Sequence, residues 1–206
     1  MNTTINLTEA RKYLTDLVLQ AGENLKKYFT SGNFTSKSKG GVDFLTQADE
    51  EVDAFLRENI AKKYPQSNFL TEETAPKDYS HLKDTENLWV IDPLDGTVNF
   101  SRKHPHFAIS IGLVDKAVSK LGVVYAPLEN NLYWAQRDLE NAFLNGDPIR
   151  VSVTDDLKET VLACDWGWDL EKRLEAAKWL GKISTKVRQV RSIGSAVADL
   201  ASLAAG

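Results

Sequence analysis

The sequence predicts a mixed α/β protein, and three features of its 206 residues support this prediction. Two long stretches near the N-terminus carry apolar residues at helical spacing and are separated by short β-rich runs. A series of β-rich runs with polar turns follows between residues 106 and 144. From about Val151 onward the pattern becomes strand, helix, strand, helix, which is typical of a separate α/β layer. We therefore expect an N-terminal α+β subdomain over residues 1–150 and a partial C-terminal α/β subdomain over residues 151–206.

The expected elements of the first half are set by apolar periodicity and by breaker residues. In chain order they are a helix at Thr8–Tyr28 with Thr8 as its N-cap, a mobile loop at Ser31–Gly41, a strand at Val42–Thr46, a helix at Ala48–Tyr64 ended by Pro65, a strand at Asn68–Leu70 and a polar loop at Lys77–Asn87.

The expected elements of the second half begin with a β-meander. They are strands at His106–Val114, Lys120–Tyr125, Leu132–Ala135 and Ala142–Leu144, then a strand at Thr160–Cys164, a helix at Leu170–Ile183, a strand at Val187–Val190 and a small-residue helix at Ser195–Ala205.

Composition excludes several classes of protein. Hydrophobic residues make up 42% of the chain and charged residues 26%, as in ordinary globular proteins. The net charge of -4 gives no electrostatic reason to expect a nucleic-acid partner. The N-terminus lacks the pattern of a signal peptide, and no apolar run approaches the roughly 20 residues of a membrane span. Since Cys164 is the single cysteine, it has no intrachain disulfide partner, and we expect a cytoplasmic protein without a membrane partner.

One stretch carries two carboxylates at the end of an apolar run. Leu88–Ile91 is predicted to be a buried strand that ends at Pro93, because proline cannot donate to a sheet ladder. Asp92 and Asp95 follow the run, and Gly96 permits a close approach of the backbone. Carboxylates suit a hard cation such as Mg²⁺, and exposed N–H groups suit a phosphate. The stretch therefore predicts metal-assisted phosphate chemistry.

A second acidic strand end strengthens this interpretation. Glu72 and Glu73 follow a short strand, although such a pair alone is also typical of a solvated loop, and the Asp92–Asp95 run alone is also typical of a turn. Strand ends of open α/β sheets are where ligands bind, so the two together favour a site. Two carboxylates ~4 Å apart repel by about 4 kcal/mol at an effective dielectric of 20, and a shared cation removes this repulsion.

The haloacid-dehalogenase phosphatases offer one alternative, because they use an Asp-x-Asp-Gly-Thr motif. Their nucleophilic Asp lies two residues before the second Asp. In this chain that position is Pro93, and the nearest preceding carboxylate is Asp92, three residues before Asp95. The nucleophile is missing, which excludes this alternative.

The run Trp89–Phe100 resembles the Asp-Pro-x-Asp-Gly-Thr-x-Asn-Phe signature of the inositol monophosphatase family of Mg²⁺-dependent phosphatases. Other stretches resemble the family in the same order, and they are Val42–Asp49, Leu70–Glu73, Ser110–Tyr125 and Arg191–Ala196. The resemblance implies an α-β-α-β-α sandwich of the sugar-phosphatase type and a homodimer. It also implies lithium-sensitive hydrolysis of a small phosphate monoester by direct attack of a metal-activated water.

The resemblance also implies roles for individual residues. It makes Glu72, Asp92 and the Leu94 carbonyl ligands of a first Mg²⁺, and it makes Asp92 and Asp95 ligands of a second. Asp49 and Thr97 correspond to the catalytic pair that positions and deprotonates the water. Substrate contacts are implied for Asp95, Gly96, Thr97, Gly194 and Ser195. Glu73 is implied to support the metal ligands, and the loop with Lys37 and Lys39 resembles a mobile loop at the metal site.

Two departures from the family pattern qualify the expected activity. Thr71 stands where many members have Gly. Family members continue past the small-residue helix to a Trp-Asp motif that completes the second metal site, whereas the pair Trp168-Asp169 precedes Gly194. We interpret Asp169 as the N-cap of the following helix. We therefore expect a phosphoric monoester hydrolase of reduced activity. The alternative is a non-catalytic remnant that binds Mg²⁺ and phosphate, or a fragment that acts only with a partner.

Overall fold

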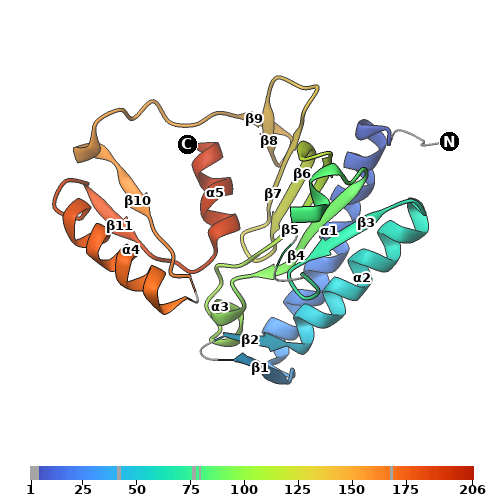
Figure 1. Ribbon diagram of the computed structural model, residues 1–206, viewed down its shortest axis with the longest axis horizontal. Helices are drawn as coiled ribbons and strands as arrows, with labels where there is room; N and C mark the ends of the chain where they lie inside the picture. The colour runs from blue at the N-terminus through green and yellow to red at the C-terminus, as the bar shows by residue number, and fades with distance from the viewer. Residues whose placement is uncertain (1–4, 41–42, 76–77, 79, 168) are drawn as a thin grey trace.

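The computed structural model describes residues 5–40, 43–75, 78, 80–167 and 169–206. Its centre is a seven-stranded sheet in the order β3-β4-β5-β6-β7-β8-β9 (Figure 1). The strands are β3 (Asn68–Thr71), β4 (Leu88–Asp95), β5 (Ala108–Asp115), β6 (Val118–Ala126), β7 (Asn131–Gln136), β8 (Ala142–Leu144) and β9 (Asp147–Ile149). β3 and β4 are parallel, and the remaining neighbours are antiparallel.

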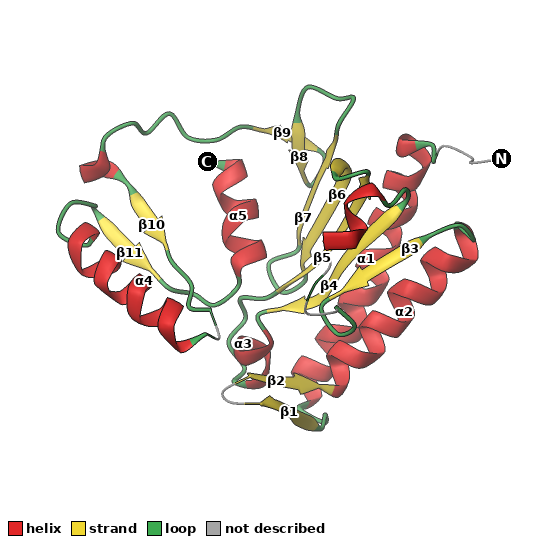
Figure 2. Cartoon of the chain, in the orientation of Figure 1, coloured by secondary structure: helices red, strands yellow, loops and turns green. Residues whose placement is uncertain are grey.

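Helices and a second sheet complete the layers. Helices α1 (Leu7–Ser31) and α2 (Gln47–Lys63) cover one face of the large sheet, and α5 (Ala196–Ala205) lies on the other. Beyond α5 are the parallel pair β10 (Val161–Ala163) and β11 (Gln189–Arg191) and the outer helix α4 (Leu170–Ile183) (Figure 2). The predicted mixed α/β fold with alternating helix and sheet layers is confirmed.

The main core lies between the α1/α2 layer and the large sheet. Its helices contribute one apolar stripe each, and alternate residues of β4, β5 and β6 point toward them. Its fully buried members include Leu14, Leu25, Leu56, Ile60, Trp89, Ile91, Ile109, Ile111 and Val123. Strand β4 is thereby fixed on one face by close packing, and its carboxyl end carries Asp92 and Asp95.

The first helix begins before the predicted cap. The N-cap is Asn6, whose side-chain oxygen accepts a hydrogen bond from the Glu9 N–H at 3.1 Å, so the prediction of Thr8 was wrong. Thr8 lies inside the helix, because an Asn at the cap position satisfies the free N–H groups of the first turn as well as a Thr would. The helix ends at Gly32, which adopts a φ of 70°.

The segment predicted as a loop at residues 31–41 contains a strand. β1 (Ser36–Gly40) pairs antiparallel with β2 (Asp43–Thr46). Alternating Ser and Lys gave no apolar signal for a strand, but main-chain hydrogen bonds in a hairpin need none. Val42, the predicted start of β2, lies outside the described residues.

Strand β4 continues past Pro93, where the sequence predicts its end. Asp92 pairs with Ser110 and Asp95 pairs with Ala108, so one extra residue is accommodated on β4. Such a bulge tolerates proline because the extra residue makes no ladder hydrogen bond. The bulge therefore brings Asp95 to the sheet edge beside Asp92.

The outer layer matches its predicted elements closely. The helix over Leu170–Ile183 is confirmed, and Asp169 caps it by accepting the Lys172 N–H at 2.9 Å. Trp168 lies outside the described residues. β9, a strand of three residues at one side of the large sheet, was not predicted. In the described part of the chain, no helix is both long and apolar enough to cross a membrane.

Candidate active site

Strands β3 and β4 carry acidic residues at their carboxyl ends, which lie side by side because the strands are parallel. We call this end of the sheet, with Glu72, Asp92 and Asp95, the acidic edge. The strands run parallel with Thr71 opposite Ile91, and the Glu72 N–H donates to the Ile91 carbonyl at 3.1 Å. Glu72 and Asp92 thus follow paired positions. Burial raises the pKa of Asp92 to about 8, with further contributions from the negative charges of Glu72 and Asp95. A cation relieves this kind of accumulated repulsion.

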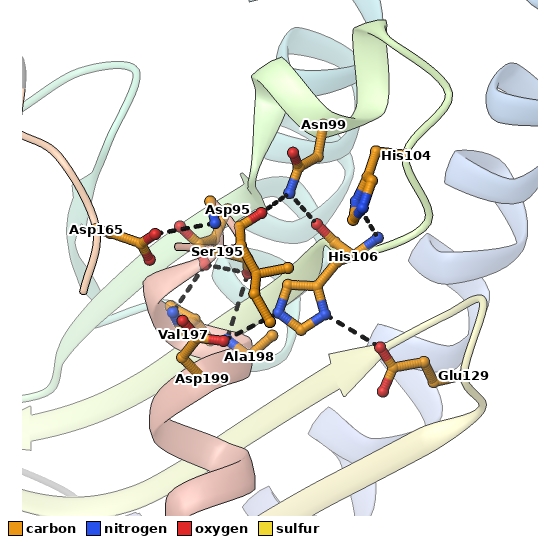
Figure 3. Close-up of polar contacts among 12 residues, drawn as sticks. Asp95, Asn99, His104, His106, Glu129, Asp165, Ser195, Val197, Ala198 and Asp199 are labelled. Atoms are coloured by element: carbon orange, nitrogen blue, oxygen red, sulfur yellow. Dashed lines mark hydrogen bonds and ion pairs between the residues drawn. The ribbon is translucent and has the colours of Figure 1, made fainter. Parts of the chain in front are cut away.

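Asp95 is oriented by the start of α5. One of its carboxylate oxygens, Oδ2, accepts a hydrogen bond from the Ser195 hydroxyl at 2.5 Å and another from the Val197 N–H at 2.8 Å (Figure 3). Burial raises the pKa of Asp95, and these two hydrogen bonds oppose the increase. Asp95 therefore joins the acidic edge of the large sheet to the second half of the chain.

The predicted pair Asp49 and Thr97 meets beside this edge. The Thr97 hydroxyl lies 3.0 Å from Asp49 Oδ1 and 3.1 Å from the Leu94 carbonyl oxygen, and its single proton can be donated to either. The other oxygen of Asp49 accepts from the Thr46 N–H at 2.9 Å and from the Thr46 hydroxyl. Burial raises the pKa of Asp49, whereas the hydrogen bonds from Thr46 lower it. The carboxylate is consequently fixed with one oxygen toward Thr97.

Gly96 is required by the close approach of three segments. Its φ is 97°, and a Cβ at this position would lie 3.0 Å from the His106 carbonyl oxygen and 3.2 Å from that of Gly194. A side chain would be strained in conformation and would also push these segments apart. The glycine therefore allows α3 (Thr97–Ser101) to begin directly after Asp95.

A cavity of about 670 Å³ lies in front of these residues. Glu72, Asp92 and Asp95 line one side. The other side comes from the second half of the chain, where its lining includes Asp165, Trp166, Arg173, Ser192 and Gly194. We did not predict Asp165, Trp166 or Arg173 from the sequence, because they lie far along the chain in segments without a motif.

Gly194 and Ser195 occupy different positions relative to this cavity. Gly194 is on the wall, has a φ of 88°, and donates its N–H to Asp165 at 2.9 Å. Ser195 is fully buried, and its hydroxyl both donates to Asp95 and accepts from the Ala198 N–H at 3.3 Å. The structure thus gives Ser195 a helix-capping position, and its predicted substrate contact stays a prediction.

Of the two predicted loop lysines, Lys37 forms an exposed ion pair with Glu50 at 3.0 Å. The side chain of Lys39 lies outside the described part of the structure.

The residues around Asp92 fit a hard cation by donor chemistry. Carboxylate oxygens and the Leu94 carbonyl are the donors that Mg²⁺ prefers, and Mg²⁺ needs few of them because it retains several waters. Among the described residues, no three His, Cys, Asp or Glu side chains are gathered as a metal-binding group. Since Asp95 Oδ2 is directed to Ser195 and Val197, the first predicted metal site is the better formed of the two.

The chain is similar to known proteins in both sequence and structure. The profile of the inositol monophosphatase family matches residues 6–206. Nus factor SuhB of Salmonella typhimurium is 39% identical over 185 residues, with 88% of this chain and 67% of that protein covered. Inositol monophosphatase of Mesembryanthemum crystallinum is 36% identical over 195 residues, covering 93% and 71%. The solved Thermotoga maritima IMPase has a TM-score of 0.83 at 30% identity, covering 96% and 73%.

Proposed function

The chain belongs to the inositol monophosphatase family, and from this membership and the carboxylate geometry we propose that it hydrolyses a small phosphate monoester with Mg²⁺. Inositol monophosphate or a related sugar phosphate is the proposed substrate. The observation that carries the proposal is the hydrogen bond between Asp49 and Thr97, because Thr97 lines the same 670 Å³ cavity as Asp92.

Within this proposal, Glu72, Asp92 and the Leu94 carbonyl would hold the first Mg²⁺, and Asp92 and Asp95 would hold the second. When bound, Mg²⁺ supplies positive charge that stabilises the phosphate oxygens and makes a nearby water more acidic. Its loss from the site should therefore abolish turnover.

The proton transfer is assigned to Asp49 and Thr97. The Thr97 hydroxyl donates its proton to Asp49 Oδ1 and can in turn accept a proton from the attacking water. The water oxygen bonds to phosphorus, the phosphorus–oxygen ester bond breaks, and the leaving alkoxide takes up a proton from solvent; Asp49 later returns its proton to solvent. The products are inorganic phosphate and the free alcohol, without a phosphoenzyme.

Substrate recognition is assigned to the cavity wall. Gly96 and Thr97 line the cavity, and we assign their N–H groups to the phosphate, with Arg173 on α4 as an additional cation. We assign Asp95 and Gly194, which line the same cavity, to the substrate hydroxyls. The homodimer, the cytoplasmic location and the lack of a nucleic-acid partner stay predictions.

A second candidate is binding of Mg²⁺ and phosphate without turnover. It is favoured by one observation, namely that one carboxylate oxygen of Asp95, Oδ2, is already engaged by Ser195 and Val197. In that case the chain would retain the first metal site and lose the transition-state stabilisation that a second cation provides.

Phosphate release distinguishes the two candidates. The substrates to compare are inositol monophosphate, fructose 1,6-bisphosphate, histidinol phosphate and a 3′-phosphoadenosine nucleotide, each with Mg²⁺, with EDTA and with added Li⁺. We expect Mg²⁺-dependent release that Li⁺ inhibits. Calorimetric binding of Mg²⁺ and ester without release would support the second candidate.

A matched pair of variants on α2 tests the catalytic assignment. Asp49→Asn removes the proposed base, and Glu58→Gln makes the same change of carboxylate to amide at an exposed position of the same helix. We expect a loss of about 10²- to 10⁴-fold for the first variant and none for the second. Equal activities would refute the role of Asp49.

A further inference from the structure

His106 lies between two carboxylates that come from different layers of the molecule. Its Nδ1 is 3.2 Å from Glu129 Oε1, in the turn between β6 and β7, and its Nε2 is 3.1 Å from Asp199 Oδ1, on α5 (Figure 3). The side chains of His106 and Asp199 are only 14% and 13% exposed. The imidazole therefore links the large sheet to α5 at a largely buried position.

The contact with Asp199 lies one helical turn from the groups that orient Asp95. The Asp199 N–H donates to the Ser195 carbonyl at 3.0 Å, which places the two residues on successive turns. Ser195 and Val197, in the same turn, are the two hydrogen-bond donors to Asp95. A change in the position of this turn would therefore move both donors.

The backbone of His106 is tied to the other side of the site. Its carbonyl oxygen accepts a hydrogen bond from Asn99 Nδ2 at 2.7 Å, and the same Asn99 nitrogen donates to the Ile193 carbonyl at 2.7 Å. The His106 carbonyl also packs against Gly96, where it leaves no room for a side chain. Both ends of His106 thus contact segments that border the cavity.

Apolar packing alone holds α5 only weakly. The buried side chains of the helix are Ala198 and Ala201, whereas Leu200 and Leu203 are 66% and 61% exposed. Small side chains bury little apolar area, so they contribute less to fixing the helix than larger ones would. The polar contacts at Asp95 and His106 therefore supply a larger share of the interactions at its first turn.

The contact with His106 offsets part of the free-energy cost of burying the Asp199 carboxylate. The second carboxylate oxygen, Oδ2, is buried and has no hydrogen-bond partner among the described residues. A partly satisfied carboxylate at such a position is costly unless a donor pairs with it. The other oxygen, Oδ1, lies 3.1 Å from His106 Nε2, which donates to it when that nitrogen carries the ring proton.

We infer that His106 is a positioning residue: through Asp199 it fixes the first turn of α5, and thereby the Ser195 and Val197 donors that orient the Asp95 carboxylate. The inference rests on the proposed function for its effect on turnover. Its effect on α5 is independent of that function and can be measured separately.

Amide hydrogen exchange tests the structural part. We expect His106→Phe to increase exchange in peptides that cover residues 195–199 and to leave exchange in α1 and in the large sheet unchanged. His106→Gln, whose amide can still donate to Asp199, should restore protection. Unchanged exchange at 195–199, or a uniform increase through the whole chain, would overturn the inference.

Kinetics test the catalytic part with the same variants. We expect His106→Phe to lower kcat by up to about 10-fold with little change in KM, at the low end of the range for removing a direct partner of a ligand, because His106 acts through Asp199. His106→Gln should recover most of this loss. Two controls, Glu129→Gln and His104→Gln, should retain wild-type kcat, because each leaves the His106–Asp199 contact in place.

A double-mutant cycle shows whether the two residues act together. The double variant His106→Phe/Asp199→Leu should lower kcat no further than the single variant with the lower kcat, because both substitutions remove the same interaction. Additive losses would overturn the link through Asp199. If the wild-type chain releases no phosphate, the proposed function fails, while the exchange experiment still decides whether His106 positions α5.

Discussion

The large sheet with α1 and α2 differs sharply from the outer layer of β10, β11 and α4. The first unit buries more than twenty apolar side chains, including Trp89 and Leu14 at 0% exposure. Among the described residues from 150 to 206, the buried ones are Ser195, Ala198 and Ala201, and all three belong to α5 or its cap. Yet the cavity takes its walls from both regions.

The difference in packing separates the residues proposed for catalysis from those proposed for substrate binding. The acidic residues and the Asp49–Thr97 pair arise from closely packed elements, which hold catalytic groups in a fixed geometry. Asp165, Trp166 and Arg173 arise from a layer with few buried contacts, and such layers open more easily than a core. Catalytic geometry should therefore withstand changes in the outer layer, whereas substrate affinity should respond to them.

The largest expected effect is on turnover, after substitution of the acidic edge. Asp92→Asn should reduce phosphate release by about 10³-fold, because the residue is proposed to hold cations that stabilise charge in the transition state. Asp115→Asn is the matched control, since Asp115 ends the antiparallel strand β5 at the opposite edge of the sheet. If Mg²⁺ binding by calorimetry survived in Asp92→Asn, the ligand assignment would be wrong.

The next effect measures the difference in packing directly. Leu14→Ala should lower the free energy of unfolding by about 2–5 kcal/mol, since it empties a fully buried position. Leu174→Ala on α4, where the leucine is 56% exposed, should lower it by less than about 1 kcal/mol. Chemical denaturation gives both values. Similar losses would show that the outer layer is packed as firmly as the core.

A third effect concerns pH in the metal-free protein. The folded-state pKa of Asp92 is about 8 against an ordinary 3.8, so the folded state binds a proton more readily than the unfolded state between these values. Stability should therefore fall as pH rises toward 8. In EDTA, we therefore expect Tm to be lower at pH 8 than at pH 5.

Asp92→Asn and Mg²⁺ provide the controls for this pH effect. The variant should show a flatter dependence of Tm on pH, because it removes the titrating group. Added Mg²⁺ should raise Tm more at pH 8 than at pH 5. A Tm that rises steadily to pH 8 in EDTA would contradict the raised pKa.

Most of the fold and the acidic side of the cavity could be predicted from the sequence. Particular residues show why these predictions succeeded and others failed. Local patterns identified α4 and the strand that leads to Asp92, because apolar spacing and an Asp cap act over a few residues. β1 was missed because Ser36–Gly40 is held by pairing rather than by apolar side chains. Pro93 was misjudged because a bulge depends on the neighbouring strand.

The far wall of the cavity depends on tertiary contacts. Arg173 comes within reach of the acidic edge only when α4 folds against the loop at Gly167, so no local motif announces it. The same holds for His106 and Asp199, which are 93 residues apart. Residues that reach a site from another layer of the fold cannot be predicted from sequence spacing, because their contacts form only in the tertiary structure.

The smallest expected effect tests this far wall. Arg173 is partly buried, lines the cavity, and donates from Nε to the Gly167 carbonyl. We expect Arg173→Gln to raise KM for the phosphate ester about three- to tenfold with kcat nearly unchanged, because a cation remote from the reacting atoms binds ground state and transition state alike. Lys172→Gln removes the same charge from the neighbouring exposed position and should leave KM unchanged. If Arg173→Gln instead lowered kcat about three- to tenfold, the guanidinium would act on the reacting phosphate. Arg173 would then contribute to catalysis, and the outer layer would not be limited to substrate binding.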